Sequence, residues 1–193
     1  ASLKERGFDA MMRFRVTAPP TDEPIDLKMV RDTHLRGIPD DSSENDYLRQ
    51  LIRAAREYCE NYTGLSLGTQ TLEALPDRLE KTMTLPRPPI RRIVSVTVTR
   101  KDESVETVPA SAYRLDAGRS LLCFSDLPEN VETPIITYEA GTLELPATVQ
   151  QAILLLVGHW YDNREAVVVG SVTSVEVGMA VKNLLNQNKD WWF

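Results

Sequence analysis

The stretch I-V-S-V-T-V-T, residues 93–99, decides the fold class. Its valines occupy every second position from Val94 to Val98, and serine or threonine fills the positions between them. This period of two is typical of a strand with one buried face, because successive side chains of a strand point to opposite sides. Shorter runs with the same period continue around it, separated by the turn-forming segments P-R-P-P, K-D-E-S, D-A-G-R and L-P-E-N. We therefore expect an antiparallel β region over about residues 69–141.

On both sides of this region the hydrophobic period changes to that of a helix. We expect helices over about residues 26–36, 43–63, 146–164 and 178–188. Asp26 and Ser43 are candidate N-caps, and Gly64 is placed to end the second helix in a left-handed C-cap. The predicted fold class is α+β and mainly helical, a small helical bundle with an inserted antiparallel β region and long loops.

The predicted organisation of the chain has three parts. An N-terminal arm covers residues 1–24, where Pro19, Pro20 and Pro24 oppose helix, with one short extended piece at Arg13–Thr17. A single domain covers residues 25–188, and an aromatic tail covers residues 189–193.

Composition excludes several classes of protein. Of the 193 residues, 42% are hydrophobic and 26% charged, which is ordinary for a soluble globular protein. The net charge of −6 argues against broad binding to a phosphate backbone. Cys59 and Cys123 form no C-x-x-C pair, so we expect two core thiols in a reducing setting rather than a zinc site or disulfide framework. We see no signal peptide and no apolar run long enough to span a membrane.

The run G-H-W-Y-D-N-R-E-A, residues 158–166, has the residue types of an active site. A catalytic pair of His159 and Asp162 would need a nucleophile, and a metal site would need a third ligand. The only other histidine is His34. The pattern favours a helix end that packs Trp160 inward and arranges the polar groups as a network, with Arg164 facing the negative end of the helix dipole.

Three further clusters have competing interpretations. The acidic stretch from Asp40 to Asp46 lacks the spacing of a calcium loop, and helix capping explains most of it. The arginines of P-R-P-P-I-R-R, residues 86–92, favour a solvated turn or a subunit contact over nucleic-acid recognition. The terminal W-W-F either folds back onto the core or marks an interface, because exposed aromatic side chains often do.

Four segments in order resemble the head–tail connector, or adaptor, family of tailed bacteriophages and prophages. They are M-R-F-R-V-T-A-P-P-T-D-E-P-I-D-L-K-M-V-R-D-T-H-L-R, L-I-R-A-A-R-E-Y-C-E-N-Y-T-G, L-P-R-P-P-I-R-R-I-V-S-V and L-P-A-T-V-Q-Q-A-I-L-L-L-V-G-H-W-Y-D-N-R-E-A. The resemblance runs from about Met12 to Ala166, and the chain after Val167 is similar to the family only loosely.

The resemblance implies a structural virion protein without catalytic residues, cofactor or metal. Family members form a ring, typically of twelve copies, beneath the portal protein. The ring extends the DNA channel and docks the tail or a further neck protein, a stopper or tail terminator. Double-stranded DNA then passes the acidic lumen without specific binding, and no membrane is involved. The expected location is the virion neck, with assembly in the host cytoplasm.

The resemblance also suggests roles for individual residues. A C-terminal segment directed at the portal makes Trp191, Trp192 and Phe193 the expected portal interface, and Arg91 and Arg92 are expected at the subunit interface. The residues expected to have structural roles at the helix end are Trp160, Tyr161, Asn163, Arg164 and Glu165.

Two other functions remain open at this point. One is a nucleic-acid-binding accessory of DNA packaging, which would require a basic face. The other is a hydrolase that uses His159.

Overall fold

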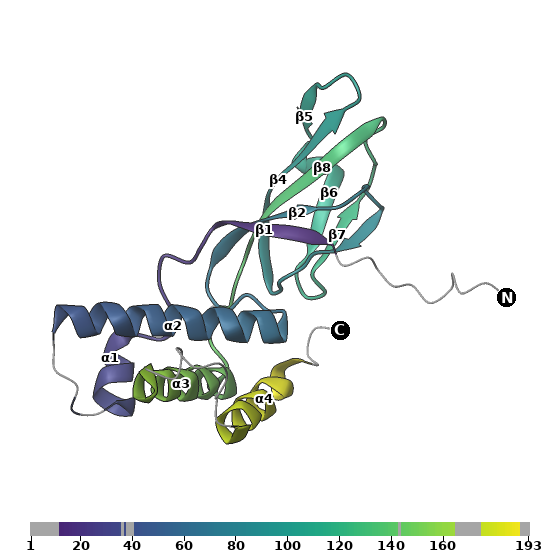
Figure 1. Cartoon of the computed structure of the whole chain (residues 1–193). Coiled ribbons are helices and arrows are strands. Elements are labelled where there is room, and N and C mark those ends of the chain that lie inside the picture. Colours follow the sequence, from purple (N-terminus) through teal and green to yellow (C-terminus); the bar gives the residue numbers. More distant parts are fainter. Residues whose placement is uncertain (1–11, 36, 38–40, 143, 165–174, 190–193) are drawn as a thin grey trace. The chain divides into compact units, whose positions relative to one another are not determined.

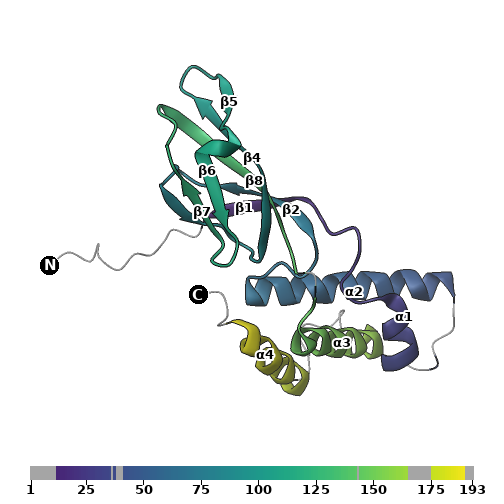
Figure 2. The ribbon, with the colours of Figure 1, turned by 180° about the vertical axis from the view of Figure 1, so that it is seen from behind.

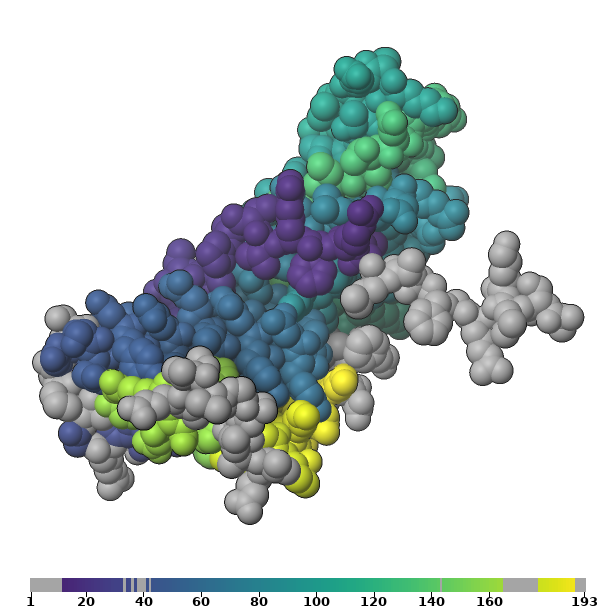
Figure 3. Space-filling model, in the orientation of Figure 1, coloured from purple at the N-terminus to yellow at the C-terminus, as the bar shows by residue number. Residues whose placement is uncertain are grey.

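The structure, a computed structural model, describes residues 12–35, 37, 41–142, 144–164 and 175–189. Within them the chain forms two compact units, drawn as a ribbon in Figure 1 and as a space-filling view in Figure 3. We call residues 12–19 and 69–141 the β unit, and the described parts of residues 20–68 and 142–189 the helical unit.

The β unit contains two antiparallel sheets. Its strands are β1 (Arg13–Ala18), β2 (Gln70–Leu75), β3 (Thr82–Thr84), β4 (Ile90–Arg100), β5 (Val105–Thr107), β6 (Tyr113–Asp116), β7 (Leu121–Phe124) and β8 (Val131–Ala140). A five-stranded sheet has the order β1-β2-β8-β4-β5, and a three-stranded sheet has the order β3-β7-β6. A short 3-10 helix, η2 (Ala110–Ala112), precedes β6.

One hydrophobic core lies between the two sheets. The larger sheet contributes Val96, Ile136 and Tyr138, and the smaller sheet contributes Leu122 and Phe124. The buried Tyr138 hydroxyl donates a hydrogen bond to the carbonyl of Pro86 at 2.8 Å, so its polar group is satisfied. Strand β1 is nearer the viewer in Figure 1 and strand β6 in Figure 2, which shows the sheets on opposite sides of this core.

The prediction of a mainly helical bundle was wrong. Strands β4 and β8 are 11 and 10 residues long and, with the other strands, build a unit with its own core. The extended piece predicted in the N-terminal arm is β1, which pairs with β2 from Arg13↔Leu75 to Ala18↔Thr71. The pairing of strands that are far apart in the chain gives no signal in the local hydrophobic periodicity. The strand content was therefore underestimated from the sequence.

Strand β4 departs from the simple alternation of its valines. Val96 and Val98 are buried, but 47% of Val94 is exposed. The register shifts between Ile93 and Ser95, where one extra residue enters the strand as a bulge. Val94 is this extra residue. A bulge breaks the alternation of side chains between the two sides of the sheet, and this is why Val94 does not join the core.

The helical unit contains a short helix α1 (Leu27–Met29) that continues as a π-helical turn η1 (Val30–His34), and three longer helices. These are α2 (Ser42–Thr63), α3 (Ala147–Asp162) and α4 (Val175–Lys189), which begins three residues before the start expected from the sequence. They enclose a second hydrophobic core. No helix in the described ranges is long and apolar enough to cross a membrane.

Local sequence explains the ends of these helices. Asp41, rather than Ser43, is the N-cap of α2, and its carboxylate accepts a 2.8 Å hydrogen bond from the Ser43 amide. Gly64 ends α2 with φ +77°, a conformation that side chains with a Cβ disfavour. Cys59 on α2 is buried, and burial raises the pKa of its thiol to about 12.

A buried ionic network crosses the helical unit. The Arg56 side chain is 3% exposed and donates to Glu23 at 2.8 Å and to Glu60 at 2.7 Å. The second Glu60 oxygen accepts the Leu67 amide at 2.8 Å. The network therefore joins α2 to the segments before and after it, and each of these charges has an opposite partner.

Candidate assembly surfaces

The end of α3 is joined to the first turn of α2 by a cluster of Glu44, Tyr47, Tyr161 and Arg164, the helix-end cluster. The Arg164 guanidinium donates to both oxygens of the Glu44 carboxylate, at 3.1 and 2.6 Å. The Tyr161 hydroxyl donates to the same carboxylate at 3.0 Å. Such a bidentate contact fixes the orientation of the two side chains as well as their distance, because the guanidinium is planar.

The Arg164 guanidinium also contacts two aromatic rings. It is 4.5 Å from the ring centroid of Tyr47 and 4.4 Å from that of Tyr161, within the range of cation–π contact. The hydrogen bonds from Arg164 and then Tyr161 lower the pKa of the Glu44 carboxyl, and the bond to Glu44 raises the pKa of Arg164. The pair therefore stays charged near neutral pH, so the cluster can join two helices but is poorly suited to proton transfer.

The other residues of the run from His159 to Arg164 are arranged around the helix end. The Asn163 side-chain amide donates to the His159 carbonyl at 2.8 Å, which satisfies part of the open end of α3. Trp160 is half-buried against the helical core, and its ring meets Tyr58 edge-on at 6.5 Å. Asp162 is exposed, and Glu165 lies outside the described residues.

His34 packs against α3 at a glycine. A Cβ added to Gly158 would lie 2.7 Å from the His34 ring nitrogen Nε2, so His34 occupies the space that this glycine leaves. Sequence reasoning had no signal for this approach, which joins η1 to α3. The described residues contain no group of three histidine, cysteine or acidic side chains that could hold a metal ion.

The acidic stretch before and within α2 resolves into separate roles. Asp41 caps the helix, and Asp46 pairs with Arg49 at 2.7 Å. Glu44 pairs with Arg164, a partner that the capping interpretation missed, and Asp40 lies outside the described residues.

The arginines of the turn into β4 lie on the β unit. Arg92 donates to both oxygens of Glu139 on the neighbouring strand β8, with a Nε–Oε2 distance of 2.8 Å. These hydrogen bonds lower the pKa of Glu139 and raise that of Arg92. Arg91 donates to the Thr69 hydroxyl at 2.8 Å. The Arg92 side chain is 64% exposed, so a further partner can reach it.

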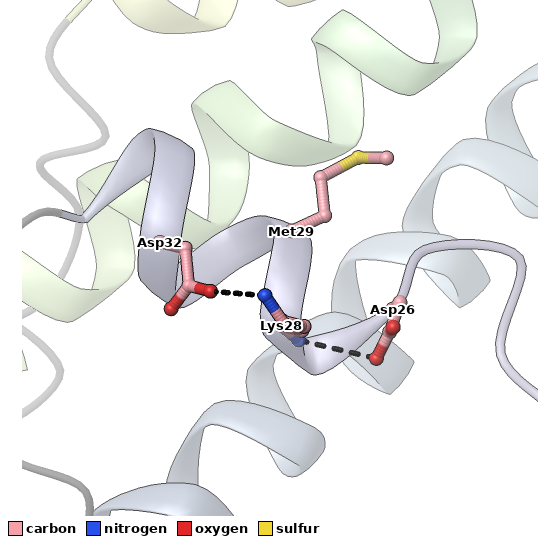
Figure 4. Close-up of a pocket in the computed structure, with 4 residues that line it drawn as sticks. All are labelled: Asp26, Lys28, Met29 and Asp32. Carbon is pink, nitrogen blue, oxygen red and sulfur yellow. Dashed lines mark hydrogen bonds and ion pairs between the residues drawn. The ribbon is translucent and has the colours of Figure 1, made fainter.

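A shallow hollow on the helical unit is lined by Asp26, Lys28, Met29 and Asp32 (Figure 4). Asp26 accepts the Lys28 amide as the cap of α1, and the Lys28 ammonium pairs with Asp32 at 2.8 Å. Its charged groups thus have helix-capping and surface-pairing roles, and the hollow gives no indication of a ligand.

The predicted portal interface lies outside the described residues, because Trp191, Trp192 and Phe193 follow the end of α4. At that end the Lys189 ammonium lies 5.2 Å from the Tyr62 ring centroid. The Tyr62 hydroxyl donates to Asn186 at 2.8 Å. These two contacts fix the last turn of α4 against the end of α2.

Comparison with known proteins identifies the family. The sequence matches the family model of the head completion protein over residues 33–177, which is most of the chain. The chain belongs to the head completion protein family. The protein is therefore a structural protein of phage-type particles, and the resemblance to connectors of tailed bacteriophages is confirmed.

Solved structures share the fold of this chain. A chain in the neck of an empty gene transfer agent (GTA) particle, computed with C6 symmetry, is 20% identical at a TM-score of 0.73, covering 94% of this chain and 95% of that chain. A chain from the virion of a native gene transfer agent is 21% identical at 0.70, covering 89% and 94%. A chain in the neck of the native particle, computed with C12 symmetry, is 21% identical at 0.61, covering 91% and 94%. No curated protein sequence matches the chain.

Proposed function

We propose that this protein forms a ring in the neck of a phage-type particle, beneath the portal protein, and connects the head to the tail. The observation that carries the proposal is the match to a neck chain, which covers 94% of this chain and 95% of that one and so includes both units. The C12 symmetry with which one such neck was computed supports a ring of twelve copies here.

The terminal aromatic residues, the arginines of β4 and the helix-end cluster each have a role in this ring. Trp191, Trp192 and Phe193 bind the portal, and Arg91 and Arg92 lie at contacts between copies. The helix-end cluster stiffens the helical unit, which must keep its form while DNA passes. The net charge of −6 repels DNA phosphates from the lumen, so the genome slides without specific binding. The opposite end of the ring docks the tail or a further neck protein.

This function requires no catalysis, cofactor, metal or membrane. It places the protein in the particle neck after assembly in the host cytoplasm.

The test is electron microscopy of portal rings mixed with the purified protein. We expect a second ring, coaxial with the portal and with one copy for each portal subunit. A protein that remains monomeric beside portal would contradict the proposal. A protein that instead binds double-stranded DNA tightly in a mobility-shift assay would favour a packaging accessory.

A further inference from the structure

Charge is divided unequally between the two units of the chain. The β unit, residues 12–19 and 69–141, has 11 lysines and arginines and 11 aspartates and glutamates. The segments 20–68 and 142–193 have 9 and 15, so they account for the whole net charge of −6. Copies of the chain therefore repel one another through their helical units, whereas their β units are electrically neutral.

Within the β unit, one part of a sheet face carries no charged side chain. Between β4 and β8, the register pairs Ser95 with Thr137, Thr97 with Ile135 and Thr99 with Thr133. On β5, Thr107 lies opposite Thr97 and Val105 lies opposite Thr99, so both face the same side of the sheet. The residues on this side of β8, β4 and β5 form what we call the threonine face: Ser95, Thr97, Thr99, Val105, Thr107, Thr133, Ile135 and Thr137. None of the eight is buried, and 70% of Val105 is exposed.

This face is turned away from the core of the β unit. The intervening residues Val96, Val98 and Ile136 are fully buried between the sheets, and successive side chains of a strand alternate between its two sides. Strand β5 lies at the upper end of the sheet in Figure 1, and its outermost position leaves the face open along that edge.

We propose that the threonine face is a contact surface between neighbouring copies of this chain in the ring, so that like-charged copies meet through their neutral units. The inference rests on the ring function proposed above. Depletion of charge is the compositional mark of an interface core, and β-branched side chains pack closely when a sheet face is covered. DNA cannot be the occupant, because the face has no cation to meet a phosphate.

The charged half of the same sheet side supports this assignment. Next to Thr137, β2 presents Glu73, which pairs with Arg15 on β1. Beyond it along β8, Glu139 pairs with Arg92. These ion pairs border the threonine face as a polar rim borders an uncharged interface centre.

The first experiment adds charge to the face. The variant Thr107→Glu/Thr133→Glu changes two exposed positions, and the control Gln50→Glu/Gln151→Glu adds the same charge at exposed positions of α2 and α3. On mixing with portal, we expect the face variant to form rings at least about ten-fold less efficiently than the control, since an unpaired charge in an interface is costly. Both should keep the melting temperature of the wild type. Equal ring formation by the two variants would overturn the proposal.

Cross-linking provides a second measurement that does not depend on adding charge. With Cys123→Ser as background, a maleimide-linked benzophenone on Thr107→Cys should, on irradiation, join two copies of the chain in wild-type-like rings. A photoreactive probe is needed because each face in a ring meets a different surface of the neighbouring copy. Product that contains portal, or no product, would contradict the proposal. If the background protein itself forms no ring with portal, the ring function fails rather than this inference.

Discussion

Arg164 and Glu44 lie 120 residues apart in the chain, and the guanidinium of one donates to both carboxylate oxygens of the other. This pair links the chain just after α3 to the first turn of α2, and the Arg164 guanidinium contacts the rings of Tyr47 and Tyr161. A sequence that looked like an active site therefore supplies a fixed connection between two helices. In the ring proposed above, such a connection would keep the helical unit rigid.

The Glu44–Arg164 pair should make the helical unit sensitive to acid. The pKa of Glu44 is lowered below its ordinary value of 4.5. Its contribution to stability is thus complete above that value and is lost as pH falls through the lowered pKa. We expect the melting temperature, followed by helical circular dichroism, to fall less between pH 7 and acid in Glu44→Gln than in the wild type. The exposed Glu144→Gln is the control and should keep the wild-type slope.

Arg56 and Arg53 should differ sharply although both lie on α2 near Glu23. Arg56 is 3% exposed and holds two carboxylates, whereas Arg53 is 69% exposed and 3.8 Å from Glu23. We expect Arg56→Ala to lower the free energy of unfolding by about 3–5 kcal/mol, because it removes the buried cation that pairs with Glu60 and Glu23. Arg53→Ala should change it by less than about 1 kcal/mol. Urea unfolding of both variants measures the difference, and equal costs would show that the network is dispensable.

Gly158→Ala should have opposite effects in two backgrounds. In the wild type the new Cβ would lie 2.7 Å from the His34 ring, and we expect a loss of about 1–3 kcal/mol as the ring is displaced. In His34→Ala the space is open, so the helix propensity of alanine should stabilise α3 by about 0.5–1 kcal/mol. A thermal double-mutant cycle gives both values. The same sign in both backgrounds would mean that His34 does not fill this space.

These features also show how far sequence reasoning reaches. The valines of β4 and the cap residues Asp26 and Gly64 carry local signals, since strand period and helix ends depend on neighbouring residues. The partner of Arg164 and the pairing of β1 with β2 depend on distant chain segments and had no such signal. For the same reason the fold appeared mainly helical, although each short strand belongs to a sheet.

Reversal of the Arg92–Glu139 pair should separate folding from assembly. Arg92→Glu alone places two carboxylates opposite each other on β4 and β8 and should weaken both sheet and ring. Adding Glu139→Arg restores an ion pair of opposite direction. We expect the double variant to melt like the wild type but to form fewer rings with portal, since a neighbouring copy would meet the wrong sign. If rings recover fully, the pair acts only within one subunit.

The aromatic residues at the end of the chain should bind the portal without contributing to the fold. The described part of α4 already supplies the buried Val181 and Leu185 to the helical core, and the contacts of Tyr62 with Asn186 and Lys189 hold its last turn. Removing residues 190–193 should therefore leave the circular dichroism spectrum and melting temperature nearly unchanged. Each aromatic ring that the portal covers removes roughly 150–250 Å² from water, and twelve tails in one ring would act together. We expect the truncated protein to lose portal binding in a sedimentation assay, whereas Lys182→Ala, an exposed change on the same helix, should bind as the wild type does. Wild-type affinity after truncation would place the portal contact elsewhere. Unfolding after truncation would instead assign Trp191, Trp192 and Phe193 to the subunit's own core.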